Sequence, residues 1–126
     1  MMNLVDLIDL IKKRPGMYIG KCEIDRLYLY IAGFIICLKL NNLNDDFLMN
    51  YQKYFNYFVQ FKVIKNSDEI VKRKLRFNNG MSFVQLIPFV EKDSQKQIDF
   101  YFECFDEFKI LFDENYDFES LKKQFM

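Results

Sequence analysis

The sequence predicts an all-α protein, folded as a compact bundle of about five helices in a single domain over residues 1–126. Apolar residues recur at the three- and four-residue spacing of helices in four separate stretches. Of the 126 residues, 51% are hydrophobic and 18% are aromatic, which is enough for one core in a chain of this length. The connections between the stretches are short, as in helical bundles.

The first predicted helix covers about residues 3–13. Leu4, Leu7, Ile8 and Ile11 share one face, and Asn3 is placed to cap the N-terminus. Pro15 disfavours helical geometry in the residue before it, so we expect the chain to turn out of the helix there.

A second helix is predicted from near Glu23 to about Lys39. It is apolar on most of its circumference, which favours a place in the middle of the bundle. A third helix follows over residues 47–58, where aromatic side chains recur at helical spacing.

Residues 68–88 allow two interpretations. The pair Asn79-Gly80 is a two-residue turn signal, which would give a short hairpin. Alternatively the segment is an irregular loop or short helix, followed by a helix that starts at Ser82, because Ser82 and Gln85 have the spacing of a capping box. We favour the helix, although Pro88 would strain it after its first turn.

The last predicted helix, residues 97–112, separates apolar from acidic side chains most clearly. One face gathers Ile98, Tyr101, Phe102, Phe105, Phe108 and Phe112, and the other gathers Asp99, Glu103, Asp106, Glu107, Asp113 and Glu114. The chain has 18 acidic and 18 basic residues, yet residues 91–126 hold ten acidic and five basic ones. The neutral total therefore conceals a long acidic stripe scarcely relieved by cations. Such a stripe is either a solvated helix face or a surface that binds a basic protein partner.

Composition argues against catalysis. The chain has no histidine, which removes the usual general base and the commonest metal ligand. Its three cysteines are an odd number without a CxxC pair, as expected for reduced thiols in the cytoplasm. The N-terminal run does not have the pattern of a signal peptide. We therefore expect a cytoplasmic protein that is not an enzyme, with no cofactor, no metal and no membrane partner.

The stretch KRPGMYIG, residues 13–20, combines turn residues with large apolar ones. We expect Met17, Tyr18 and Ile19 to plug this loop into the core, with Gly16 and Gly20 as backbone joints. The string RPGMYIG also resembles one near the nucleotide site of type II topoisomerase ATPase subunits. Here, however, residues 27–40 hold neither the acid nor the asparagine of that family, and no DxGxG follows.

A second resemblance covers more of the chain. The residues that carry it are Arg14, Pro15, Gly16, Met17, Tyr18 and Gly20, then Ile24, Leu27, Gly33-Phe34 and the late FYFECFDEF, Phe100 to Phe108. This pattern is similar to small bacterial immunity proteins of contact-dependent growth inhibition and related polymorphic toxin systems. It departs from them at Glu23, where serine is usual, at Phe34 for tyrosine, and at Phe83 for tryptophan.

The resemblance implies an all-α immunity protein that binds and neutralises one cognate toxin domain by blocking its active site. If the toxin is a cationic nuclease, the six carboxylates of the last helix would form the binding surface, because they can imitate a phosphate backbone. No direct nucleic-acid contact is expected in that case. The alternative is a small nucleic-acid-binding or regulatory module that uses the basic segment, residues 62–76, with Phe61 and Phe77 to stack bases.

Overall fold

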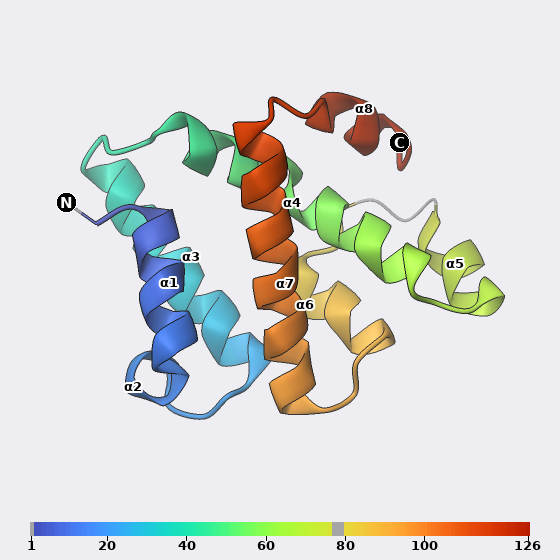
Figure 1. Ribbon diagram of the computed structural model, residues 1–126, viewed down its shortest axis with the longest axis horizontal. Helices are drawn as coiled ribbons and strands as arrows, with labels where there is room; N and C mark the ends of the chain where they lie inside the picture. Colours follow the sequence, from blue (N-terminus) through green and yellow to red (C-terminus); the bar gives the residue numbers. More distant parts are fainter. Residues whose placement is uncertain (1, 77–79) are drawn as a thin grey trace.

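The computed structural model describes residues 2–76 and 80–126, and within them the protein is all-α, without a strand (Figure 1). The predicted fold class is confirmed. The elements are α1 (Leu4–Lys13), α2 (Pro15–Ile19), α3 (Ile24–Leu40), α4 (Asp46–Lys65), α5 (Glu69–Arg76), α6 (Phe83–Leu86), the 3-10 helix η1 (Ile87–Phe89), α7 (Ser94–Asp113) and α8 (Phe118–Lys123). The described helices outnumber the five predicted, because several connections contain short helices of their own.

The long helices α4 and α7 contribute more buried side chains to the core than the other described helices. They pack against each other, and α4 also contacts α5, α6 and α8 (Figure 1). Aromatic rings fill their interface: Phe108 meets Phe55 at 5.5 Å between ring centroids. The hydroxyls of Tyr51 and Tyr101 lie 2.9 Å apart in the core, so each buried hydroxyl has a hydrogen-bond partner.

Capping side chains set where the helices begin. Asn3 and Asp6 form a capping box at α1, and the Asp45 and Asp93 carboxylates accept backbone N–H bonds at α4 and α7. The helix predicted to start at Ser82 is confirmed as α6. Its one turn continues into η1, as expected where a proline interrupts a helix. Asn79, the first residue of the alternative hairpin turn, lies outside the described residues.

The motif at residues 14–20 folds differently from the predicted loop. Pro15 begins α2, a position that suits proline because its missing N–H would be unpaired there anyway. A five-residue helix can turn only one narrow face inward. Ile19 occupies that face and is buried, whereas Met17 is 70% exposed and Tyr18 is half-buried. The expected burial of Met17 is therefore wrong. Gly20, with φ of 72°, is a backbone joint as predicted.

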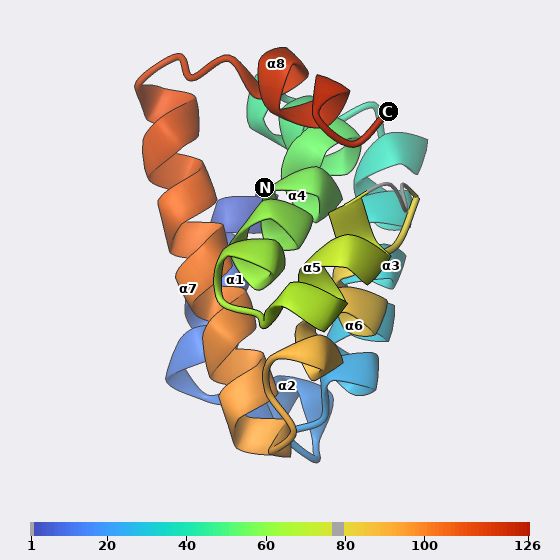
Figure 2. The same ribbon diagram turned by 90° about the vertical axis from the view of Figure 1, so that its right-hand side faces the viewer.

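The helix predicted from near Glu23 to about Lys39 is confirmed as α3, but its expected place in the middle of the bundle is wrong. In Figure 2, α3 runs along the right-hand edge of the molecule. Its inner side packs on α2, α6 and α7, and its outer side leaves Leu29, Ile36 and Leu40 exposed by 67%, 57% and 79%. A uniformly apolar helix predicts burial on every side, but no other described helix covers the outer side of α3. No helix in the described part of the chain is long and apolar enough to cross a membrane.

Candidate protein-binding groove on α7

The apolar face of α7 fixes the direction of its acidic face. Ile98, Tyr101, Phe102, Phe105 and Phe108 are buried, and Phe112 is half-buried. Because a helix carries its residues at about 100° intervals, the carboxylates between these positions must point away from the core. Five of the six predicted apolar positions are thus fully in the core, and the orientation of α7 matches the prediction.

The six predicted binding residues divide into two groups. Asp99, Glu103, Asp113 and Glu114 are exposed. Asp106 and Glu107 are half-buried and paired: Lys12 of α1 lies 2.5 Å from Asp106, and Lys62 of α4 lies 2.7 Å from Glu107. The stripe was expected to have scarcely any cations beside it, but two of its six carboxylates are paired with lysines. The two lysines lie far from α7 in the sequence, so the residue pattern of the last helix does not predict these ion pairs.

The partly buried pair of Lys62 and Glu107 affects its surroundings. Burial alone would lower the pKa of the Lys62 ammonium, but the hydrogen bond and charge of Glu107 outweigh it and hold that pKa above its usual value. Burial raises the pKa of the nearby Cys104 thiol to about 12, more than Lys62 lowers it. Cys104 is therefore a protonated, inert core residue.

The exposed carboxylates nearest the N-terminal half of α7 lie on a concave surface. A groove of about 370 Å³, here called the acidic groove, is lined by Lys12, Pro15, Gln95, Asp99, Phe102, Glu103 and Asp106. Asp99 accepts a hydrogen bond from Gln95 at 3.0 Å, and Glu103 has no hydrogen bond or ion pair in the described structure. Because Pro15 lines the acidic groove, the RPGMYIG motif forms part of its surface. Lys12 and Gln95 were not among the predicted site residues, because the sequence does not show that the motif and the acidic stripe lie side by side.

Asp113 and Glu114 lie outside the acidic groove. They stand at the C-terminal end of α7, where Glu114 is the C-cap residue. Two carboxylates at this end meet unpaired backbone carbonyls, an arrangement that the helix dipole disfavours. They contribute negative charge to the same helix but do not share the concave surface.

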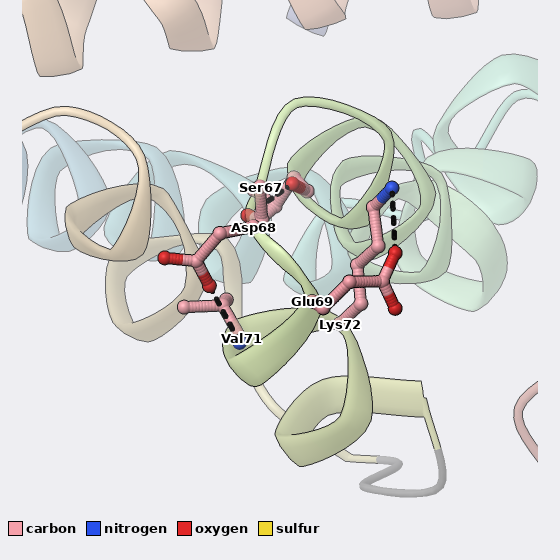
Figure 3. Close-up of polar contacts among 6 residues, drawn as sticks. Ser67, Asp68, Glu69, Val71 and Lys72 are labelled. Carbon is pink, nitrogen blue, oxygen red and sulfur yellow. Dashed lines mark hydrogen bonds and ion pairs between the residues drawn. The ribbon is translucent and has the colours of Figure 1, made fainter.

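The basic segment provides the other candidate surface (Figure 3). The Asp68 carboxylate accepts a hydrogen bond from the backbone N–H of Val71 at 3.0 Å, which stabilises the start of α5. Lys72 lies 3.7 Å from Glu69, and Lys74 lies over the ring of Phe89 at 5.5 Å from its centroid. Lys72 therefore already has an ion-pair partner, and Lys74 already has an aromatic one.

The aromatic side chains proposed to stack bases do not reinforce the basic segment. Phe61 lines a separate hollow beside α7 and α8, together with Ile110 and Tyr116. Phe77 lies outside the described residues. Arg73 and Arg76 are exposed on α5.

The described residues contain no group of three or more side chains that could hold a metal ion. Burial also raises the pKa of the Tyr51 and Tyr101 hydroxyls, which form a hydrogen bond with each other in the core. Comparison with protein-family models, with curated proteins and with solved structures found no match to this chain. The exposed carboxylates of the acidic groove suit recognition of a positively charged partner.

Proposed function

We propose that this chain is a cytoplasmic immunity protein that binds a cationic toxin domain through the acidic groove and neutralises it. The observation that carries the proposal is the placement of Asp99 and Glu103. Both carboxylates are exposed and have no ion-pair partner among residues 2–76 and 80–126, and they line a concave surface whose other wall includes Pro15 of the motif. The resemblance of that motif to immunity proteins supports the same reading.

The charge pattern gives the proposal a physical mechanism. A nuclease must hold phosphates, so its substrate channel is positive. Carboxylates along the groove can bind cationic side chains at the rim of that channel and so cover it, and their field attracts the toxin before contact. Association would then be fast at low salt and slower as salt screens the charges. Inhibition would require no chemical step by this chain.

The alternative function uses the basic segment for nucleic acid or regulation. Exposed Arg73 and Arg76 favour it, since phosphate recognition needs accessible cations on one surface. The pairing of Lys62 with Glu107 and of Lys72 with Glu69 weakens it, because those charges are partly compensated. Binding of the unmodified protein to duplex or single-stranded nucleic acid would be the direct evidence for this alternative.

The decisive experiment compares two charge reversals of equal size. Asp99→Lys with Glu103→Lys changes the acidic groove, and Asp113→Lys with Glu114→Lys changes the end of α7 by the same charge. A large toxin reading frame found upstream of the one for this chain would supply the partner, as its variable C-terminal domain. Association is measured by stopped flow at two salt concentrations, and protection by growth during toxin expression.

We expect the groove variant to associate about tenfold to a hundredfold more slowly at low salt and to lose protection, while the control variant changes association severalfold at most. Circular dichroism should show both variants folded, because exposed carboxylates contribute little to stability. Full protection by the folded groove variant would contradict the proposal. The basic segment would then be tested with Arg73→Glu.

A further inference from the structure

The outer face of α3 carries an apolar ridge that the acidic groove does not explain. Leu29, Ile36 and Leu40 lie on one side of the helix and are exposed over more than half of their surface. Residues 27–38 contain no charged side chain at all. Apolar patches of this kind on a soluble protein mark an interaction surface.

A hollow lies directly beside this ridge. It has a volume of about 310 Å³, lies between α3, α4 and α6, and is lined in part by Tyr28, Ile36, Lys39, Phe55 and Phe83. Ile36 belongs to both the ridge and the hollow. The surface therefore carries a protrusion and a recess next to each other, which is what a patch needs in order to pack against a copy of itself.

The middle and the ends of α3 indicate how two copies would pair. Gly33 is exposed near the middle of α3, the adjacent Ala32 is half-buried and lines the hollow, and a Cβ added at Gly33 would meet nothing within 4 Å, so another helix can approach closely there. Asp25 lies seven residues before Ala32, and Lys39 lies seven residues after it. Both are exposed, and neither has an ion-pair partner within the described chain.

The geometry points to a homodimer in which α3 packs antiparallel on α3 of a second copy, with the two-fold axis near Ala32. In this arrangement Asp25 of each copy lies opposite Lys39 of the other, so the symmetry produces two ion pairs. Leu29 of each copy comes to lie near Ile36 and the hollow of the other, since these residues are nearly equidistant from the axis.

Charge favours this occupant over other arrangements. A parallel pair would place Lys39 beside Lys39 and Asp25 beside Asp25, and like charges in contact disfavour association. The antiparallel pair also sets opposite ends of the two helix dipoles side by side. The acidic groove on α1 and α7 shares no lining residue with this surface, so the dimer is independent of the proposed function.

The test uses a charge exchange that only a symmetric antiparallel interface can rescue. Asp25→Lys alone would place two lysines opposite each other at both ends, and Lys39→Asp alone would do the same with two aspartates. The double variant restores opposite charges. Sedimentation velocity over a concentration series, up to roughly 100 μM, gives the dimer dissociation constant of each protein.

We expect a dimer for the unmodified protein, a dissociation constant raised by about tenfold or more in each single variant, and a return to within about threefold in the double variant. Ile36→Asp should give a monomer with an unchanged circular dichroism spectrum. Asp113→Lys, far from the surface, is the control and should leave the dimer intact. A monomer at every concentration, or a double variant no better than the singles, would overturn the proposal.

A cross-link tests the axis itself. In a variant with Cys22→Ser and Cys37→Ser, Ala32→Cys should form a disulfide-linked dimer under mild oxidation, because the two copies of residue 32 face each other. Lys21→Cys in the same background serves as the control and should cross-link much more slowly. Equal cross-linking at both positions would contradict the predicted axis.

Discussion

Helices α3 and α7 are both long, and each buries a stripe of large side chains, but they present opposite surfaces to solvent. The outer side of α7 carries carboxylates, two of them paired with lysines from α1 and α4. The outer side of α3 carries Leu29, Ile36 and Leu40. Burial of one face is all that the core requires of a helix, so the composition of the other face can serve binding.

The two helices also hold their cysteines in opposite environments. Cys104 on α7 is buried, and burial raises its pKa to about 12, whereas Cys37 on α3 is exposed. Because the thiolate is the reactive form, a thiol reagent at pH 8 should modify Cys37 at least about a thousandfold faster than Cys104. Timed labelling followed by mass spectrometry measures both sites, and urea should make them equal. Fast labelling of Cys104 in the native protein would contradict its placement in the core.

The next largest effect concerns the core side of α7. Phe108 is fully buried against Phe55, Phe58 and Phe118, so Phe108→Ala should lower the free energy of unfolding by about 3–5 kcal/mol through the cavity that it leaves. The matched control is Ile110→Ala on the same helix, where the side chain is 56% exposed and the loss should stay near or below about 1 kcal/mol. Urea unfolding followed by circular dichroism measures both. Equal losses would mean that α7 is turned differently about its axis.

The segment that leads into α3 offers a third test of inner against outer positions. Ile19 is buried and Met17 is exposed within the same short helix α2. Ile19→Ala should cost about 2–4 kcal/mol, while Met17→Ala should change stability by about 0.5 kcal/mol or less. Tyr18→Ala should fall between them, since Tyr18 is half-buried with an edge contact to Tyr30 at 6.2 Å between ring centroids. Thermal melts measure the three losses. If Met17 were the residue that anchors α2, Met17→Ala would cause the largest loss of stability and Ile19→Ala the smallest.

The contrast between α3 and α7 also explains what could be predicted from sequence. The pattern of α7 alternates apolar and acidic residues at helical spacing, so its inner face could be assigned residue by residue. The pattern of α3 is apolar all round and contains no signal for which side is covered. Coverage depends on where the other helices lie, and spacing within one helix carries no such information.

The candidate site was predictable only in part for the same reason. The carboxylates of α7 were identifiable from their spacing, but their pairing was not. Lys12 and Lys62 reach Asp106 and Glu107 only after α1, α4 and α7 have packed. The acidic groove likewise depends on Pro15 and α7 lining the same hollow, although they lie about 80 residues apart in the sequence. Long-range contacts of this kind need the tertiary structure.

The smallest expected effect on stability separates the two lysines at the end of α1. Lys12 pairs with Asp106 in the acidic groove, whereas the adjacent Lys13 is exposed and has no ion pair in the described structure. Both ends of the Lys12 pair are nearly half exposed to water, so Lys12→Met should lower stability by about 1 kcal/mol or less, and salt should reduce the loss. Lys13→Met removes the same charge and should lower stability by no more than Lys12→Met does.

The Lys12→Met and Lys13→Met variants should nevertheless differ in binding. Lys12→Met leaves the Asp106 carboxylate unpaired beside Asp99 and Glu103, which makes the acidic groove more negative where a cationic partner would contact it. Association with a cationic toxin domain should therefore become severalfold faster at low salt in Lys12→Met than in Lys13→Met, as stopped flow can measure. Equal rates would mean that the partner responds to the overall charge of the molecule and not to the groove, and would place the binding surface elsewhere on the acidic half of the chain.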